Sequence, residues 1–195
     1  FPGRCGNRDG SASWESRLDP ASVALPRARG VVEIGFGRRA GATRLTHLFQ
    51  EGCGKARLPN VAPGAPPEAV LINSSGGLTD GDRLRFAIEV GAQAHALVTT
   101  QAAEKVYRSR GGPACVEASL RVAPGACLEW LPQETILFDQ ARLQRTTTID
   151  LQGDACFLGC EALVFGRAAH GETMVDGAIR DSWRLRRDGR LLWAD

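Results

Sequence analysis

The stretch FAIEVGAQAHALVTTQ at residues 86–101 decides the fold, because its pattern occurs twice more along the chain. An alternating apolar segment is followed by a turn that contains glycine and by a second segment that begins with alanine. The other copies are ASLRVAPGACLEWLPQ at 118–133 and TTIDLQGDACFLGCEA at 147–162. A spacing of about 30 residues is typical of stacked repeats, because one strand–turn–strand unit cannot bury its own apolar face.

The strand prediction depends on strict alternation of apolar and polar residues. In DRLRFAIEV, the residues from Leu84 to Val90 are apolar at every second position, as in a strand with one buried face. CVEASLRV repeats this alternation, and ARLQRTTTIDL shows it again with Leu143, Thr147, Ile149 and Leu151 facing one way. We therefore predict a mainly β protein, a β-helix-like stack of strand–turn–strand units with one or two short helices. An antiparallel sandwich would also give short strands at regular spacing and stays open as an alternative.

The rest of the chain divides into a lead-in and a single domain. Residues 1–30 are polar, rich in Gly and Pro and without periodicity, so we expect a poorly ordered lead-in. Residues 31–195 form one predicted β domain, in which VVEIGFGRR and AVLINSS are further strands. The proline-rich LPNVAPGAPPEAV suits neither a helix nor a central strand, and it predicts a long surface loop.

The composition excludes several classes of function. The 195 residues carry a net charge of +2 and no basic stripe interleaved with aromatics, so we expect no nucleic-acid partner. No apolar run approaches the length of a membrane helix and the start has no signal-peptide core, so we expect a cytoplasmic protein without membrane contact. The six cysteines are scattered without a CxxC motif, which favours reduced thiols over disulfides.

The glycine-rich stretch NSSGGLTDGDRL at 73–84 is the first place to seek a ligand site. A phosphate-binding loop would need GxxxxGK[ST], but Gly81 is followed by Asp82, whose carboxylate would repel a phosphate. The acidic ligands of an EF-hand are missing too. Asp80-Gly81 before an alternating strand predicts a structured turn instead.

No catalytic motif accompanies this turn. The three histidines, His47, His95 and His170, lie outside any GxSxG or HExxH context. Carboxylates are present, but their spacing does not identify a general acid and base beside one pocket. The residues by themselves therefore predict no enzyme.

Five stretches, in their order and spacing, resemble the urease accessory protein family UreD, called UreH in some systems. They are SSGGLTDGDRL, TTQAAEKVYRS, LEWLPQETILFDQARL, GRAAHGE and DSWRLRRDGRLLWAD, within residues 41–195. The second and third stretches together carry the resemblance, because a generic turn would not contain them. The family's fold is described as β-helix-like, with many strands and a couple of helices, which agrees with the repeats.

The resemblance implies a chaperone for nickel insertion rather than an enzyme. Family members bind the urease apoprotein and recruit UreF, which in turn binds the GTPase UreG, so that Ni²⁺ reaches the dinickel active site. An internal polar passage is the route suggested for the metal, so nickel would be bound transiently, with no tightly held cofactor. Family members usually continue beyond the equivalent of Asp195, so we expect this chain to lack a C-terminal portion.

The resemblance also marks individual positions, which we expect to matter for the backbone geometry and local structure of the motifs. The positions that match the family motifs are Gly76, Gly77, Gly81, Thr99, Thr100, Lys105, Tyr107, Arg108, Gln133, Gly166, Arg167, Gly171 and Glu172.

Four oxygen donors, Asp82, Gln101, Glu134 and Glu161, are our candidates for lining the metal passage. Three of them follow the second strand of a repeat, where stacking would place equivalent positions about 5 Å apart. Oxygen ligands hold Ni²⁺ less tightly than imidazole or thiolate, which suits a conduit. The alternative is a structural role, accepting backbone N–H groups at turns; it is favoured for Asp82 and evenly balanced for Glu134.

Two other functions remain as alternatives. A β-helix enzyme acting on carbohydrate would need a groove with paired carboxylates and exposed aromatic platforms, whereas only 6% of the residues are aromatic. A β binding module unrelated to urease would be distinguished only by its partners.

Overall fold

The computed structural model describes residues 26–195, and this part of the chain is built almost entirely of β-strands. The predicted lead-in lies largely outside the described residues, and the first strand begins at Arg29. In chain order the strands are β1 Arg29–Arg39, β2 Ala42–Gly52, β3 Gly54–Arg57, β4 Glu68–Asn73, β5 Arg83–Val90, β6 His95–Thr100, β7 Glu104–Val106, β8 Ala114–Val122, β9 Cys127–Leu131, β10 Thr135–Leu137, β11 Arg142–Leu151, β12 Cys156–Gly159, β13 Leu163–Phe165, β14 Ala178–Arg187 and β15 Arg190–Ala194.

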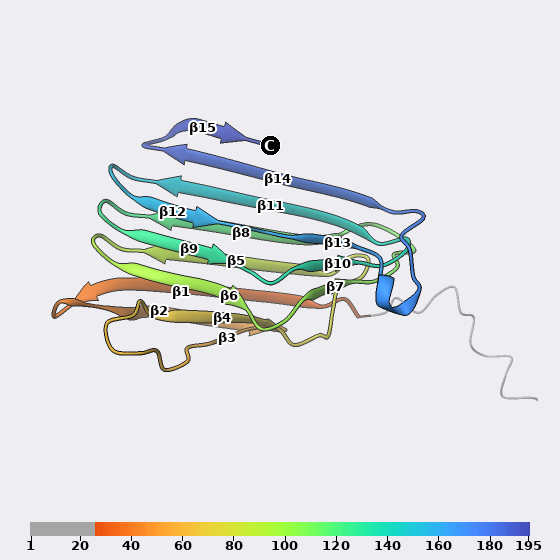
Figure 1. Ribbon diagram of the computed structural model, residues 1–195, viewed down its shortest axis with the longest axis horizontal. Helices are drawn as coiled ribbons and strands as arrows, with labels where there is room; N and C mark the ends of the chain where they lie inside the picture. The colour runs from red at the N-terminus through yellow and green to blue at the C-terminus, as the bar shows by residue number, and fades with distance from the viewer. Residues whose placement is uncertain (1–25) are drawn as a thin grey trace, which may run out of the picture.

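The strands form three sheets, and the chain climbs through them layer by layer (Figure 1). Sheet A is one wall of the stack, with seven strands in the order β15-β14-β11-β8-β5-β1-β2. Sheet B, in the order β12-β9-β6-β4-β3, and the short sheet C, in the order β13-β10-β7, continue around the other side.

One rung of the stack takes one strand from each sheet in turn, so that β5, β6 and β7 are followed by β8, β9 and β10 and then by β11, β12 and β13. Equivalent strands of neighbouring rungs pair in parallel and in register. Phe86 lies beside Ala118, which lies beside Thr147. Parallel pairing of repeated units confirms the predicted β-helix-like stack and excludes the antiparallel sandwich.

The alanines that mark the repeats lie at the turns between sheets A and B. The N–H groups of Ala94, Ala126 and Ala155 donate to the carbonyl three residues earlier, over 3.1, 3.1 and 3.0 Å. All three alanines are buried. Strands β6, β9 and β12 begin one residue later than predicted, because each alanine N–H closes its turn. The next N–H starts the backbone ladder at Cys127 and Cys156, whereas that of His95 donates to Thr43 Oγ1 at 3.0 Å.

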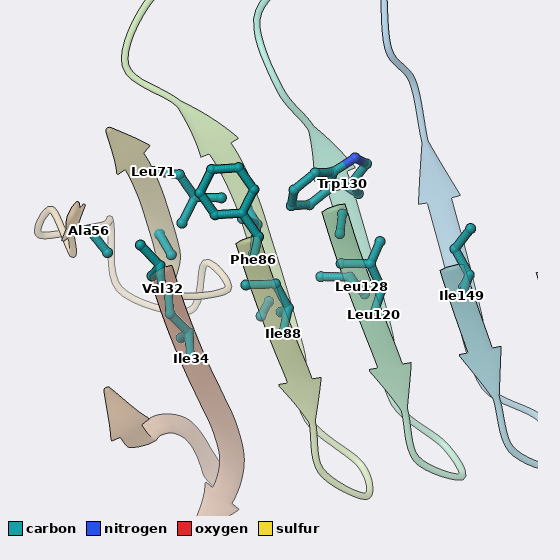
Figure 2. Close-up of a cluster of buried hydrophobic side chains, with 14 of the residues drawn as sticks. Val32, Ile34, Ala56, Leu71, Phe86, Ile88, Leu120, Leu128, Trp130 and Ile149 are labelled. Carbon is teal, nitrogen blue, oxygen red and sulfur yellow. The ribbon is translucent and has the colours of Figure 1, made fainter. Parts of the chain in front are cut away.

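Apolar side chains from the facing walls fill the space between them, and Figure 2 shows the labelled members of this core together. Val32, Ile88 and Leu120 point inward from sheet A and Leu128 from sheet B, and all are fully buried. Burying one such side chain contributes about 1.5–3 kcal/mol, so the repeated inward positions are the main source of stability.

The two ends of the stack depart from parallel pairing. At one end β2 pairs antiparallel with β1, with a bulge at Gly35, and at the other β15 pairs antiparallel with β14. The proline-rich loop occupies residues 58–67, and β4 begins at Glu68 inside the segment predicted as loop. Within residues 26–195 the only helical element is a 3₁₀ turn, Ala168–His170. None of the helical structure described has the length and apolar character needed to cross a membrane.

Candidate functional site

A cavity of about 220 Å³ lies inside the stack, where sheet B gives way to sheet C. Its walls include apolar side chains such as Leu71, Phe86 and Leu143. Polar groups enter it from β4, β6, β7, β10 and β11 and from the connections that follow β6, β9 and β12. Those groups are Asn73, Thr100, Gln101, Glu104, Lys105, Gln133, Thr135, Arg145, Thr147 and Glu161.

On the sheet A wall of this cavity, the inward row changes from apolar to charged at β11. Leu84 of β5 pairs with Val116 of β8, which pairs with Arg145 of β11, which pairs with Asp181 of β14. Arg145 and Thr147 are both buried, at 7% and 0% exposure. A guanidinium therefore occupies an inward position that two earlier rungs fill with aliphatic side chains.

Arg145 is held between two carboxylates. Its Nε–H donates to Asp181 Oδ1 at 3.0 Å and its Nη2 donates to Asp181 Oδ2, a bidentate pair. Glu161 Oε2 lies 3.0 Å from the same Nε, and Nη1 donates to Thr135 Oγ1 at 3.4 Å. Burial alone would lower the pKa of Arg145, but the hydrogen bond to Asp181 and the charge of Glu161 raise it, so the guanidinium stays charged.

Glu161 is the least satisfied member of this cluster. Its Oε1 accepts hydrogen bonds from Trp130 Nε1 at 2.7 Å and from Thr147 Oγ1 at 3.4 Å. Its Oε2 is buried and accepts no hydrogen bond, because the nearby Nε–H of Arg145 is directed at Asp181. Burial raises the pKa of Glu161, and the charge of Arg145 only partly offsets this. One oxygen of a buried carboxyl group therefore has spare capacity to bind a donor or a cation.

A second carboxylate, Glu104, faces the cavity from β7. Both of its oxygens accept from Asn73 Nδ2 at 3.2 Å. Burial raises the pKa of Glu104, while the bond from Asn73 and the charge of Lys105 act in the opposite direction. The cavity is thus lined by two carboxyl groups, contributed by β7 and by the segment after β12.

Of the four candidates for the passage, Asp82 is the one that the structure places in a turn. Its Oδ1 accepts the Ala28 N–H at 2.7 Å and its Oδ2 accepts the Thr79 N–H at 2.8 Å. The side chain is buried and is not among the cavity-lining residues. Asp82 therefore has the contacts of the structural alternative stated for it, accepting backbone N–H groups at a turn.

The other three candidates do not occupy equivalent positions. Glu104, Thr135 and Leu163 are in register across sheet C. Gln101 precedes this row by three residues, Glu161 by two and Glu134 by one. Gln101 and Glu161 line the cavity, whereas Glu134 does not, and its carbonyl accepts the Glu104 N–H at 2.9 Å.

Several family-motif residues come together in a column beside sheet C. The Tyr107 hydroxyl donates to the Gly76 carbonyl at 3.1 Å, and its ring meets Phe138 edge-on with centroids 4.9 Å apart. The Arg167 guanidinium lies over the Phe138 ring, 4.2 Å from its centroid, and forms an ion pair with Glu172. The column links segments from four successive turns, so these motif residues hold neighbouring rungs together.

Other motif residues form hydrogen bonds between neighbouring rungs. Thr99 Oγ1 donates to the Leu131 carbonyl at 2.7 Å, and Thr100 Oγ1 accepts the Gln133 N–H at 2.9 Å. The Arg108 carbonyl accepts Thr79 Oγ1 at 3.0 Å, and the Lys105 carbonyl accepts the Leu78 N–H at 2.7 Å.

Two of the motif glycines are required by space as well as by backbone conformation. At Gly77, with φ of 140°, a Cβ would lie 2.4 Å from the Tyr107 ring and 2.9 Å from the Lys105 carbonyl. At Gly166, with φ of 75°, it would lie 2.6 Å from the Glu172 carbonyl. Gly76, Gly81 and Gly171 share the positive φ, at 82°, 81° and 70°.

Arg145, Trp130 and Asp181 were not among the residues predicted from the sequence to be functional. A signal for Arg145 was present, since residues 143, 147, 149 and 151 face inward and the same alternation places residue 145 among them. Asp181 and Trp130 could be connected with it only through the register of three separate strands. In residues 26–195, no three His, Cys, Asp or Glu side chains are arranged to hold a metal ion.

Comparison with known proteins gives one consistent result. The model of the family described as UreD urease accessory protein matches residues 28–195. Among curated proteins, the urease accessory protein UreD of Methylobacterium sp. is 53% identical over 181 residues, covering 92% of this chain and 64% of the relative. Those of Xanthobacter autotrophicus and Chelativorans sp. are 50% and 49% identical, covering 95% and 91% of this chain and 66% and 64% of their own lengths. The chain thus spans about two thirds of the relatives that it matches.

Proposed function

The chain belongs to the UreD family of urease accessory proteins, and from this premise we propose that it is a non-enzymatic scaffold in urease maturation. The proposal is carried by the match of the family model along residues 28–195, together with identities near one half. In this role the chain binds the urease apoprotein and recruits UreF and, through UreF, the GTPase UreG. A rigid stack of rungs suits such an adaptor, because it presents broad sheet faces to several partners at once.

The interior cavity supports a second part of the proposal, the passage of Ni²⁺ as cargo. Glu161 and Gln101 bring oxygen donors into it, and Glu104 adds a carboxyl group on another side. The ion would contact Oε2 of Glu161, which accepts no hydrogen bond although Arg145 Nε lies 3.0 Å away, since the other oxygen is held by Trp130. Oxygen donors bind Ni²⁺ more weakly than thiolate or imidazole, so an ion that enters can leave again.

A pull-down tests the scaffold role. The tagged chain is co-expressed with the urease structural subunits, with and without UreF, and the retained proteins are identified. We expect apo-urease to be retained by the chain and UreF to join the complex. A folded chain that retains neither protein, when a longer form of the same protein also retains neither, would contradict the proposal.

Nickel passage is tested separately, with variants that keep their partners. We expect Glu161→Ala to lower the nickel content of the urease recovered from the complex, because it removes the unbonded oxygen from the cavity. Glu134→Ala is the matched control, since this glutamate lies off the cavity. Equal nickel content with both variants, at equal retention of apo-urease, would rule out a route past Glu161.

A further inference from the structure

Two rows of residues cross the outer face of sheet A. In one row positive and negative side chains are paired, and in the other all charged side chains are positive. In one row, the in-register residues of β1, β5, β8, β11 and β14 are Gly35, Glu89, Arg121, Asp150 and Arg186. Its charges alternate, with Arg121 2.8 Å from Glu89 and Arg186 3.9 Å from Asp150. We call this the paired row, because its charges neutralise one another.

The other row lies near the opposite ends of the same five strands. Its residues in strand order are Arg29, Arg83, Cys115, Gln144 and Arg180. We call it the arginine row, because it holds three cations and no acidic side chain. The three arginines are exposed, and none forms an ion pair with a carboxylate of residues 26–195.

The neighbouring arginines carry an electrostatic cost in the isolated chain. Arg29 and Arg83 are directly in register on adjacent parallel strands, about 4.8 Å apart along the pairing direction. Like charges at such positions destabilise a sheet. An anion placed between them would remove this repulsion, and guanidinium groups hold carboxylates through paired, charge-assisted hydrogen bonds.

The surface is hollowed at this place. A depression of about 250 Å³ is lined by three arginines, Arg29, Arg83 and Arg85, and also by Cys115 and Glu117. Glu117 is in register with Arg85 and offsets one of the three charges. An excess of positive charge therefore surrounds an open hollow, and the arginine row continues beyond it to Arg180 on β14.

We propose that the arginine row is a docking surface for an acidic stretch of a protein partner. The row extends over five strands, and all of its residues except the half-buried Cys115 are exposed, which fits a run of carboxylates better than one small anion. Charge complementarity of this kind steers association and fixes the orientation of a partner. As a partner surface it rests on the proposed scaffold role, but it requires neither nickel nor the interior cavity.

The test measures binding of a dye-labelled decaglutamate peptide to the 195-residue chain by fluorescence anisotropy at low salt. We expect Arg29→Gln with Arg83→Gln to weaken binding by about tenfold or more, because two charge-assisted contacts are lost. The control is Arg121→Gln with Arg186→Gln, which removes the same charge from the paired row and should change the affinity by less than about twofold. Circular dichroism checks that both double variants fold.

Three outcomes of the peptide assay would overturn the inference: equal weakening by the two double variants, no weakening by either, or displacement of the peptide by inorganic phosphate at an equal concentration of charge. The first would reveal general attraction, the second a different site, and the third a site for a small anion. Capture of apo-urease is measured on the same variants. If a variant that no longer binds the peptide still captures apo-urease, only this inference is overturned. If the unsubstituted chain fails to capture apo-urease, the proposed scaffold role is contradicted instead.

Discussion

The interior of the stack has two regions that differ in chemistry although they share one backbone plan. Between β1, β5 and β8 the inward rows are apolar, as at Val32, Phe86 and Leu120. From β11 onward the same rows contain Arg145, Thr147 and Asp181. The repeat itself does not demand this change, because β8 fills the matching positions with Val116 and Ala118.

The two regions have different roles: the apolar rows stabilise the stack, and the polar cluster is held in place by it. Apolar rungs gain stability from each buried side chain, whereas a buried ion cluster must recover the cost of removing its charges from water. A protein selected for stability alone would gain nothing from placing an arginine where a valine fits. The polar region is therefore the part of the interior that points to a function, and the apolar region is the frame that positions it.

Removing Arg145 from the centre of the polar region should have the largest effect on the free energy of unfolding. Arg145→Ala leaves Glu161 and Asp181 facing each other without a cation, with the Glu161 side chain only 4% exposed. We expect the free energy of unfolding to fall by about 4 kcal/mol, the size usual for removing one partner of a buried ion pair. Urea unfolding followed by circular dichroism measures it, and a loss below about 1 kcal/mol would mean that water already compensates the carboxylates.

Truncating the apolar region should come next in size. Leu120→Ala removes a fully buried side chain near the end of β8. We expect a loss of about 3 kcal/mol, from the lost burial and the cavity left behind. Leu120→Ala should lower nickel transfer less than it lowers stability. It therefore serves as the control for lost stability when Arg145→Ala is tested for nickel transfer.

The comparison is sharpest when the polar cluster is neutralised as a whole. A triple variant, Arg145→Met with Glu161→Gln and Asp181→Asn, removes all three charges and keeps an acceptor for Trp130 Nε1. We expect its free energy of unfolding to lie within about 1.5 kcal/mol of the unsubstituted chain, since replacing a whole buried ion cluster is often nearly neutral. Nickel transfer should nevertheless be lowered. A triple variant as unstable as Arg145→Ala would show that the cluster is structural.

The frame was predictable from sequence because its signal is local. Alternation in β5, β8 and β11 and the glycine turns that follow them repeat along the chain, and together they predict a parallel stack. The polar cluster depends on register between distant segments. Asp181 reaches Arg145 only because a longer connection, residues 166–177, still returns β14 in register with β11. Similarly, the offset between Glu134 and Glu161 arises in short connections whose register the repeat pattern does not specify.

The smallest effect we predict is the pH dependence that Glu161 contributes. Burial raises the pKa of this carboxyl above its ordinary value of 4.5, so the folded chain holds the proton more tightly than the unfolded chain does. The resulting stabilisation is complete below the unfolded pKa and is lost as pH rises through the folded pKa. The stability of the unsubstituted chain relative to Glu161→Gln should therefore decrease as the pH rises above the ordinary carboxyl pKa of 4.5.

Urea unfolding of both proteins at several pH values measures this difference directly. Burial also raises the pKa of Glu104, so the comparison with Glu104→Gln should show a trend of the same sign. A difference that grows with pH at Glu161 would mean that pairing with Arg145 outweighs burial. The buried carboxylate would then be a satisfied ion-pair partner, and the contrast between the apolar frame and an unsatisfied polar interior would lose its strongest element.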